Sequence, residues 1–218
     1  DGTWGRPVDG TPTTHILKPA IARFAGTVEN EAFCMRVAKH LGLPVATVDT
    51  TTIARQKLLV VERYDRAVDD SGVVVRIHQE DFCQATGVLP DNKYEDDGGP
   101  SLRKIADVLQ AATSPDALDA FLRSVTLNVL VTNGDAHGKN FSLLHEESGA
   151  LTLSPLYDVL CTLQYGIDRL AMHIDNVHRS NRVTAARIVN EARGWGMTKS
   201  HAAEIVNDIL ARAPQAID

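Results

Sequence analysis

Three residues in the second half of the chain, Asp135, Asn140 and Asp158, carry side chains that could support phosphoryl transfer. Magnesium prefers oxygen ligands and usually keeps waters and substrate phosphates around it, so one carboxylate and one amide oxygen are a sufficient protein contribution. A second carboxylate then remains to accept the proton of an attacking hydroxyl group. These residue types therefore suit a magnesium-dependent transfer of phosphate.

The step from Asp135 to Asn140 has the D-x-x-x-x-N spacing of the protein-kinase catalytic loop. The spacing alone is weak evidence, because Asp, Asn and Gly also occur in loops that only form turns and caps. The context favours the chemical interpretation: an apolar helix is predicted before the loop, and a hairpin of residues 141–145 and 151–153 after it. Because the ends of a hairpin lie side by side, we expect Asn140 and Asp158 at the same edge.

Strands and a helix in the first third of the chain are expected to face this loop. Residues 13–18 read as a strand that Pro19 stops, so Lys18 lies at its end. Residues 29–41 read as a helix whose apolar positions are Phe33, Val37, Ala38 and Leu41. The pairing of Lys18 with a helix bearing Glu31 resembles the strand lysine and helix glutamate of kinases, although a lone surface lysine is the alternative.

The remaining pattern changes from mixed to helical along the chain. Strands are expected over residues 45–48, 58–61 and 73–77, and from about residue 79 onward the pattern is mainly helical. The glycine- and acid-rich run at residues 93–100 indicates an exposed loop, after which Ser101 caps a helix. Further helices are expected from residue 115 to about 129, over 184–193 and over 201–213. We predict an α+β fold, with a small mixed α/β part followed by a mainly α-helical lobe.

Composition excludes several classes of protein. The 28 acidic and 22 basic residues give a net charge of −6, which argues against a nucleic-acid surface spread over the chain. The longest apolar runs are shorter than a membrane span, and the chain opens without a secretory signal, so we expect neither a membrane nor secretion. Cys34, Cys83 and Cys161 lack paired spacing and are interpreted as core thiols in a reducing cytoplasm.

Several strings in collinear order resemble one protein family. These strings span roughly residues 12 to 175 and read THILKPA, ENEAFCMRVAKHLGL, VVERYDR, RIHQEDFCQATG, KYEDDGGPS, NGDAHGKNFS and SPLYDV. Together they resemble the C-terminal kinase region of HipA-type toxins. That family implies a protein-kinase-like fold and an ATP- and Mg²⁺-dependent serine/threonine protein kinase of a toxin-antitoxin module. It also implies a protein substrate, with an aminoacyl-tRNA synthetase as one possible class, and a DNA-binding antitoxin as partner.

The resemblance also implies roles for individual residues. Asp135 is similar to the catalytic base, and Asn140 and Asp158 are similar to the magnesium ligands. Lys18 is similar to the lysine that contacts the nucleotide phosphates. The remaining residues expected to bind ATP are the hinge, Glu62, Arg63 and Tyr64, and the lining of the nucleotide site, His137, Gly138, Lys139, Asn140, Tyr157 and Asp158. A loop histidine is more often structural than catalytic, so His137 is given no proton-transfer role.

One part of the family pattern is missing from this sequence. The family has a phosphate-covering loop of the type S-x-A-G-x-Q-x-K, with an autophosphorylated serine, upstream of the strand lysine, and Gly2, Gly5 and Gly10 do not reproduce it. We therefore expect a fragment in which residues 1–66 are the remnant of the nucleotide-binding small lobe and residues 67–218 the helical catalytic lobe. Such a fragment should bind nucleotide weakly and phosphorylate poorly.

Two other functions remain open from the sequence. A small-molecule phosphotransferase of the aminoglycoside-kinase type shares the D-x-x-x-x-N loop, but its loop usually has a histidine where Asn133 stands here. A catalytically weak module that binds an antitoxin as co-repressor is the second alternative. For that role DNA contact would be indirect or would use a local basic patch, for which His178, Arg179 and Arg182 are candidates, although a solvated surface is the better explanation of these three residues.

Overall fold

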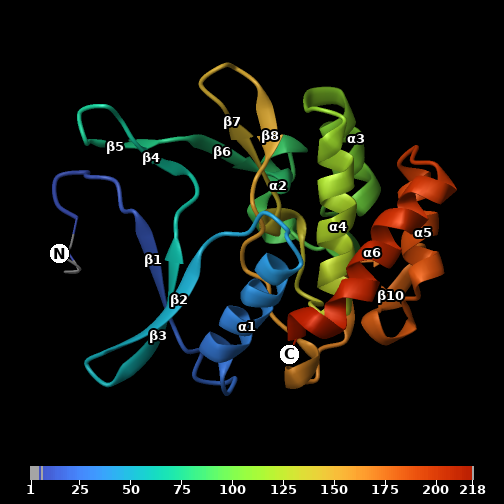
Figure 1. Cartoon of the computed structure of the whole chain (residues 1–218), viewed down its shortest axis with the longest axis horizontal. Helices are drawn as coiled ribbons and strands as arrows, with labels where there is room; N and C mark the ends of the chain where they lie inside the picture. Colours follow the sequence, from blue (N-terminus) through green and yellow to red (C-terminus); the bar gives the residue numbers. More distant parts are fainter. Residues whose placement is uncertain (1–4, 6, 218) are drawn as a thin grey trace.

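The computed structural model describes residue 5 and residues 7–217. The N-terminal part is an antiparallel sheet with strand order β1-β3-β2, made of His15–Pro19, Gln56–Glu62 and Val48–Ile53. The middle of β3 is buried, as its apolar sequence predicts, and its Leu59 lies opposite Lys18 of β1. Helix α1, Thr27–His40, lies beside this sheet and separates it from the helices of the second half (Figure 1).

Two expectations about this part are wrong in detail. The strand predicted over residues 45–48 begins only at Val48, and Val45 makes an isolated bridge to Leu156 instead. Phe33 was placed on the buried face of the helix, but its side chain is 50% exposed. Cys34 and Met35 are buried together with Val37 and Ala38, because α1 has neighbours on more than one side.

The second half contains more strands than its pattern predicted. After a hairpin of β4, Arg66–Val68, and β5, Val74–Arg76, strand β6, His78–Asp81, pairs with β7. The predicted hairpin of β7, Ser142–His145, and β8, Leu151–Leu153, is present, so β6 extends it to three strands. A further hairpin, of β9, Arg169–Ile174, and β10, Val177–Arg179, was not predicted. Among the described residues, the second half therefore contains three small sheets besides its helices.

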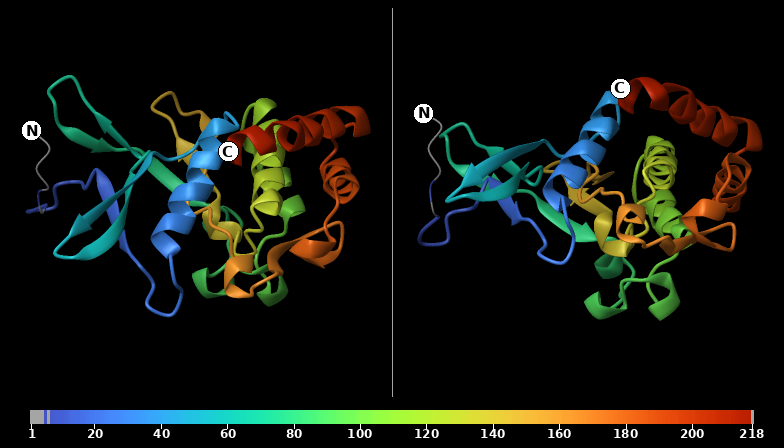
Figure 2. Two further views of the ribbon diagram at one scale, coloured as in Figure 1. Left: turned by 60° about the horizontal axis from the view of Figure 1, so that its bottom comes forward. Right: turned by 90° about the horizontal axis from the view of Figure 1, so that it is seen from below.

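The helices of this half match their predictions closely. Short α2, Phe82–Ala85, precedes α3, Leu102–Ala112, whose Ser101 side chain accepts a hydrogen bond from the Lys104 N–H as an N-cap. Helix α4, Asp116–Leu130, lies between α3 and α6, with α5 on the outer side (Figure 2). Helices α5, Ala185–Gly194, and α6, Lys199–Ile217, correspond to the last two predicted helices.

A single apolar core joins these elements. Phe121 of α4 packs its ring on Trp195 at 5.1 Å and on Phe141 at 5.3 Å, measured between ring centroids. The C-terminal helix also reaches α1, where Arg212 donates to the Leu41 carbonyl oxygen at 2.7 Å. Cys34 and Cys83 are buried as predicted, and Cys161 is partly exposed. The α+β architecture predicted from the sequence, a small mixed part followed by a mainly helical lobe, is present in the structure.

Short 3₁₀ segments complete the fold and carry several polar residues. They are η1, η2, η3, η4 and η5, at Pro90–Asn92, Glu95–Asp97, Gly138–Asn140, Leu163–Tyr165 and Ser180–Arg182. The run at residues 93–100 is therefore not a simple exposed loop. A Cβ atom on Gly99 would lie 2.6 Å from the Asn92 and Tyr94 carbonyl oxygens, so the chain folds tightly back on itself there. Among the described residues, none of the helices is long and apolar enough to cross a membrane.

Candidate active site

Lys18 connects the N-terminal sheet to the loop that follows β8. Its Nζ lies 2.7 Å from Glu31 Oε1 on α1 and 2.7 Å from Asp158 Oδ1. The lysine at the end of β1 and the glutamate on α1 thus form the pair that their order in the sequence suggested. Asp158, from a distant part of the chain, joins that pair and gives Lys18 two carboxylate partners.

Burial and charge compete at this cluster. Burial opposes the charge of Lys18, but Asp158 and Glu31 together outweigh it and raise the pKa of Lys18 above its ordinary value. Burial raises the pKa of Glu31, and the attraction of Lys18 offsets only part of that rise. Glu31 is only 7% exposed, so its carboxylate depends on Lys18 to remain charged at low energetic cost.

Asn140 and Asp158 meet at the base of the β7–β8 hairpin. Asn140 Nδ2 donates to Asp158 Oδ2 at 3.0 Å, and Asn140 Oδ1 accepts from the His137 amide N–H at 3.0 Å. Asp158 has a φ of +59°, a left-handed conformation that is uncommon outside glycine and is enriched in aspartate. The two oxygen-bearing side chains therefore share the edge to which the hairpin was expected to deliver them.

This pair fits a magnesium ion by the chemistry of its donors. A carboxylate and an amide oxygen are hard oxygen ligands, and the side chains that carry them, Asp158 and Asn140, are in direct contact. An amide oxygen has two lone pairs, so Asn140 Oδ1 can keep the His137 N–H and still face a cation. Asp158 Oδ1 accepts a hydrogen bond from Lys18, and Oδ2 accepts one from Asn140. Both oxygens of this carboxylate thus already have hydrogen-bond donors, one of them positively charged.

Asp135 is held from both sides. The Tyr94 hydroxyl donates to Asp135 Oδ1 at 2.8 Å, and the Asp135 amide N–H donates to Asn133 Oδ1 at 3.2 Å. Asn133 is only 3% exposed and donates in turn to Asn128 Oδ1 on α4 at 2.8 Å. Asn133 therefore links the loop to the most apolar helix, which gives a structural reason for an asparagine two residues before the aspartate.

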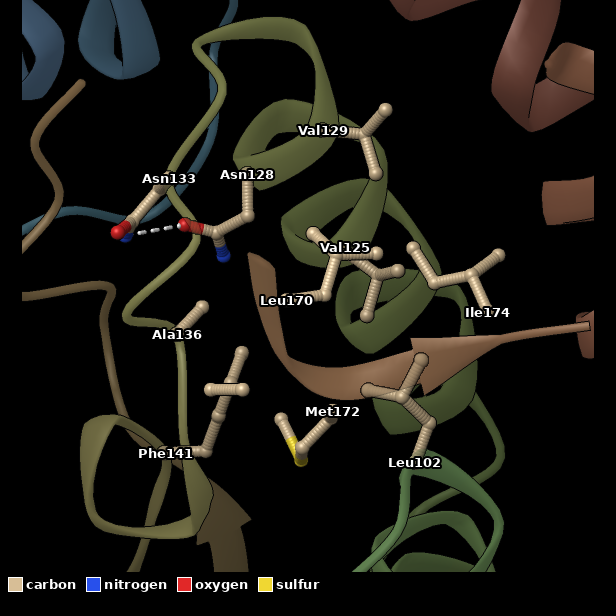
Figure 3. Close-up of a pocket in the computed structure, with 11 residues that line it drawn as sticks. Leu102, Val125, Asn128, Val129, Asn133, Ala136, Phe141, Leu170, Met172 and Ile174 are labelled. Atoms are coloured by element: carbon tan, nitrogen blue, oxygen red, sulfur yellow. Dashed lines mark hydrogen bonds between the residues drawn. The ribbon is translucent and has the colours of Figure 1, made fainter. Parts of the chain in front are cut away.

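Apolar side chains form the floor under this loop. Figure 3 shows the Asn128–Asn133 hydrogen bond beside a group of apolar side chains from α4, β9 and the loop. They surround a small cavity of about 20 Å³ and include Val125, Val129, Ala136, Phe141, Leu170 and Met172. The space is about the size that one water molecule requires, so this floor is closely packed and holds the loop from below.

Two glycines allow the loop to approach its neighbours. A Cβ atom on Gly134 would lie 2.4 Å from the Arg169 carbonyl oxygen, and one on Gly138 would lie 2.4 Å from Pro100 Cγ. The Gly134 carbonyl oxygen also accepts from the Ala171 N–H at 2.8 Å. Larger residues at either position would push the loop away from β9 or from the segment that carries Tyr94.

The other residues expected to line the nucleotide site lie around this centre. His137 is buried, with its ring edge-on to Tyr94 at 5.4 Å, and burial lowers its pKa against the opposing effect of Asp135. Tyr157 donates to the Lys139 carbonyl oxygen at 2.7 Å, and its ring lies 5.5 Å from that of Tyr64. Burial raises the pKa of Tyr64 to about 12. The contacts of Tyr157 connect the segment after β3 to the loop that contains Lys139.

The expected hinge is already partly engaged with its own neighbours. The amide N–H groups of Glu62 and Arg63 donate to the Thr47 and Thr14 carbonyl oxygens, each at 2.9 Å. The Arg63 side chain binds Asp65 through two hydrogen bonds of 2.9 and 2.6 Å. Of the three hinge positions, Tyr64 is therefore the one whose amide N–H we expect to face an adenine edge.

A cleft opens next to Asp135. Its volume is about 530 Å³, and its walls include Arg23, Phe24, Tyr94, Asp96 and Arg169 besides Asp135. Sequence reasoning missed Tyr94 and Asp96 because the run KYEDDGGP was interpreted as an exposed loop. The available signal was the aromatic residue inside that acidic run, which is unusual for a solvated turn.

Comparison with known proteins gives consistent matches over nearly the whole chain. Residues 5–217 match the sequence profile of the HipA-like C-terminal domain. The protein named "Putative kinase Y4mE" from Sinorhizobium fredii is 48% identical over 89% of this chain and 46% of its own length. The serine/threonine-protein kinase toxin HipA of Shewanella oneidensis is 33% identical over 94% of this chain and 50% of its own length.

Solved structures agree with these matches. HipA of Shewanella oneidensis, solved in complex with HipB and operator DNA, superposes with a TM-score of 0.86 at 33% identity, over 94% of this chain and 51% of that one. The proinflammatory kinase CtkA of Helicobacter pylori shares the fold at a TM-score of 0.58 and 13% identity, over 93% of this chain and 87% of that one. This chain spans about half the length of the curated relatives that it matches.

Proposed function

This chain belongs to the HipA-like C-terminal domain family, and from that membership we propose that it carries the catalytic centre of an ATP- and Mg²⁺-dependent serine/threonine protein kinase. The observation that supports the proposal most strongly is that Lys18 and Asn140 both donate hydrogen bonds to Asp158. Asp135 lies on the same loop as Asn140.

We propose that each of these side chains has a separate task. Lys18 binds the phosphates of the nucleotide, and Glu31 orients its ammonium group. Asn140 and Asp158 hold magnesium, which neutralises charge on the phosphate oxygens when it is bound with the nucleotide. Asp135 accepts the proton of the attacking serine or threonine hydroxyl, while the Tyr94 hydroxyl keeps the carboxylate in one orientation.

The adenine and the substrate would approach from different sides. The Tyr64 amide N–H is the donor that we expect at the adenine edge, with Glu62, Arg63, His137, Gly138, Lys139 and Tyr157 lining the rest of the nucleotide site. The cleft beside Asp135 has room for an extended segment of a protein substrate. Its walls carry both Arg23 and Asp97, so both acidic and basic groups of a substrate would find partners there.

The partners follow from the relatives and remain part of the proposal. We propose that the chain acts as the toxin of a toxin-antitoxin module in the cytoplasm, with a DNA-binding antitoxin as partner, because its relative HipA was solved with HipB and operator DNA. Arg179 binds Asp168 at 2.7 Å and His178 lies 2.9 Å from His173, so these members of the suspected basic patch have partners within the chain. Contact with DNA would therefore be indirect, through the antitoxin.

We also propose the division of the chain at about residue 66. Residues 1–66 would be the small-lobe part, of which residues 1–4 and 6 lie outside the described residues, and residues 67–218 the catalytic lobe. The Lys18–Asp158 ion pair would then cross the boundary between the two parts. An opening of the lobes would have to break or exchange this contact.

Replacement of Asp135 by asparagine tests the kinase mechanism. The variant keeps the size of the side chain and its bond from Tyr94, but it cannot accept the hydroxyl proton, so phosphate transfer should fall on the order of 10²- to 10⁴-fold. Transfer from γ-labelled ATP to serine- and threonine-containing protein would be measured for both forms, with Mg²⁺-dependent nucleotide binding as the control. Equal transfer rates for the two forms would refute the proposed role of Asp135.

A further inference from the structure

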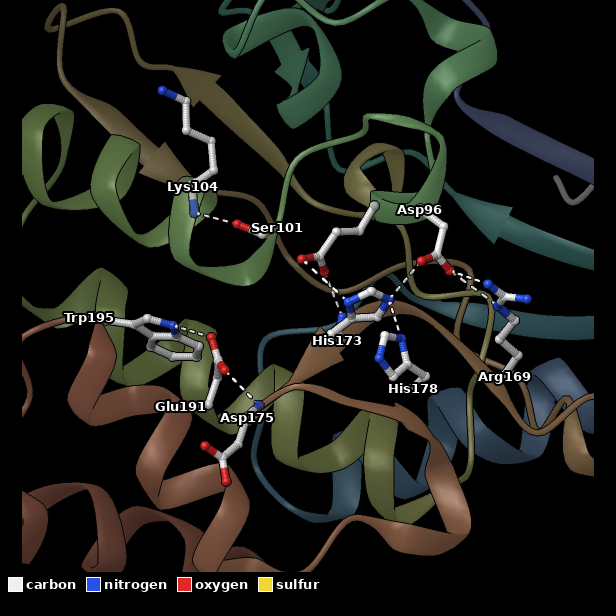
Figure 4. A network of polar contacts seen from close by, with 10 residues as sticks. Asp96, Ser101, Lys104, Arg169, His173, Asp175, His178, Glu191 and Trp195 are labelled. Atoms are coloured by element: carbon white, nitrogen blue, oxygen red, sulfur yellow. Dashed lines mark hydrogen bonds and ion pairs between the residues drawn. The ribbon is translucent and has the colours of Figure 1, made fainter.

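A second group of ligand-type side chains lies apart from the Lys18–Asp158 pair. Asp96 on η2, His173 on β9 and His178 on β10 each direct one donor atom to a common point, and these atoms lie within 4.8 Å of one another. Figure 4 shows the two imidazole rings side by side with the Asp96 carboxylate facing them. The proposed phosphoryl transfer uses none of these three side chains.

The donor atoms are close enough for one small cation. His173 Nε2 lies 2.9 Å from His178 Nδ1 and 3.2 Å from Asp96 Oδ1. Ligands about 2.0 to 2.1 Å from a tetrahedral zinc ion are separated by roughly 3.3 Å. These two distances differ from that value by only a few tenths of an ångström, and the third, between the donor atoms of His178 and Asp96, is within 4.8 Å. Shifts of the side chains of Asp96 and His178 around His173 would complete three ligand positions.

Carboxylate oxygens lie next to both ring nitrogens of His173. Its ring Nδ1 lies 3.6 Å from Glu95 Oε1, and its backbone N–H donates to Glu95 Oε2 at 2.7 Å. Its Nε2 is turned away from Glu95, toward Asp96 Oδ1 and His178 Nδ1. A carboxylate behind a metal-bound histidine is the common arrangement in metal sites, and Glu95 occupies that position at His173.

The supporting residues hold the cluster in place before any ligand arrives. Arg169 donates two hydrogen bonds to Asp96 Oδ2, at 3.1 and 2.6 Å, which leaves Oδ1 facing the histidines. Asp175 and Asn176, with φ of 50° and 61°, form the tight turn between β9 and β10. The Asp175 N–H donates to Glu191 Oε2 on α5 at 2.8 Å, which anchors the turn that sets the spacing of the two histidines.

We propose that Asp96, His173 and His178 bind a divalent transition-metal ion, best matched by Zn²⁺, with a fourth position open to water. Two imidazole nitrogens and one carboxylate are ligands that suit zinc and do not suit magnesium, which prefers oxygen donors. The metal would fasten η2 to the β9–β10 hairpin. Tyr94 stands immediately before η2, so the metal would also fix the segment that binds Asp135.

Metal binding by the untagged chain tests this proposal without reference to kinase activity. The protein would be freed of metal with a chelator, titrated with ZnCl₂ by calorimetry, and its metal content measured after gel filtration. We expect one zinc ion per chain, and with Co²⁺ in its place we expect visible absorption bands typical of a four-coordinate site. A chain that retains no zinc after gel filtration and gives no binding heat would overturn the proposal.

Variants assign the binding to the named ligands. His178→Ala removes an exposed side chain and His173→Ala a half-buried one, and each should weaken zinc binding by more than about 100-fold, beyond the 10- to 100-fold typical of supporting residues. Glu95→Gln should weaken it by roughly 10- to 100-fold. His78→Ala is the matched control, because His78 and His145 also stack, at 4.5 Å, beside a glutamate. If His78→Ala weakens zinc binding as much as His178→Ala does, the site is wrongly assigned.

Folding of the variants is checked by circular dichroism and thermal unfolding in the presence of chelator. If His173→Ala does not fold, His178→Ala and Asp96→Asn alone decide the assignment, because both side chains lie closer to the surface. Zinc should raise the unfolding temperature of the wild-type chain and leave that of His178→Ala unchanged. An equal rise in both would show that zinc stabilises the chain elsewhere and would refute the site.

Discussion

The Lys18–Asp158 cluster and the Asp96–His173–His178 cluster differ in the groups that offset the negative charge of their carboxylates. Both oxygens of Asp158 receive a donor from the protein itself, and one of these donors is a charged lysine. In the second cluster, Arg169 occupies only one oxygen of Asp96, and the other oxygen faces an imidazole whose second nitrogen is turned toward another carboxylate. The first arrangement suits a ligand that binds and dissociates in each reaction cycle, because Lys18 can neutralise Asp158 when that ligand is absent. The second arrangement suits a cation that stays bound.

Asp158→Asn should have the largest effect and separates the two clusters. The change removes the charge that binds Lys18 and, in our proposal, a magnesium ligand, so phosphate transfer should fall on the order of 10³-fold. Zinc binding by the second cluster should stay within the error of the wild-type value. The measurements are transfer from γ-labelled ATP over a magnesium titration and zinc calorimetry on the same preparation. A loss of zinc binding in Asp158→Asn would show that the two clusters are not independent.

Lys18→Met is expected to come next, with a loss of about 10²-fold in phosphate transfer, because one charged donor to the phosphates is removed. It should also destabilise the fold by roughly 1 to 2 kcal/mol near pH 7, a value reduced for the one-third exposure of the Lys18 side chain. The cause is Glu31, which stays buried without its cation. Chemical denaturation of the variant and the wild type measures this difference in unfolding free energy.

The pH dependence of that loss identifies Glu31 as its cause. Burial already raises the pKa of Glu31, and removing Lys18 takes away the partner that lowers it. A carboxyl whose pKa is higher in the folded than in the unfolded chain costs stability as the pH rises, because the unfolded chain releases the proton first. The penalty of Lys18→Met should therefore shrink as the pH falls toward 4, and Glu31→Gln should remove it in the double variant. A penalty that is independent of pH would rule out Glu31 as the source.

The parts of the site that were predictable depend on short-range connections. The end of β1, the helix after it and the β7–β8 hairpin are local patterns, and they bring Lys18 to Glu31 and Asn140 to Asp158. The contact of Lys18 with Asp158 follows from the way the two parts pack, which no local pattern fixes. The roles given to these residues remain predictions.

Other parts could not be predicted because tertiary packing decides them. β9 has the burial pattern of a strand covered on both faces around Leu170, Ala171 and Met172, so its sequence lacks the alternation that marks an exposed strand. The strand β6 forms because β7 offers it an edge, although its own residues are polar. The position of Tyr94 depends on the tight backbone approach at Gly99, which gives no periodic signal.

Tyr94→Phe should have the smallest effect and tests whether the two clusters are coupled. The hydroxyl donates to Asp135, and burial together with that hydrogen bond raises the pKa of Tyr94 to about 12, so it stays a donor at any ordinary pH. Loss of one hydrogen bond to a charged group is worth about 1.5 kcal/mol, or roughly 10-fold in the transfer rate, with the KM for ATP unchanged. Tyr165→Phe is the control, because Tyr165 lines the same cleft but its hydroxyl accepts from Asn30 and does not bind Asp135, so it should slow transfer less than Tyr94→Phe does.

Zinc removal completes this test. Zinc is removed with a chelator and Mg²⁺ is then restored in excess. If zinc acts on the reaction through η2 and Tyr94, its removal should slow the wild-type chain by no more than Tyr94→Phe does, and it should slow Tyr94→Phe itself very little. The loss of rate in the zinc-free Tyr94→Phe variant would then be smaller than the product of the two separate losses, because both changes free the Asp135 carboxylate from the same contact. If the two losses in rate multiply instead, Tyr94 and the metal affect Asp135 independently. That result would contradict the coupling of the two clusters through Tyr94, although each cluster could still bind its own ligand.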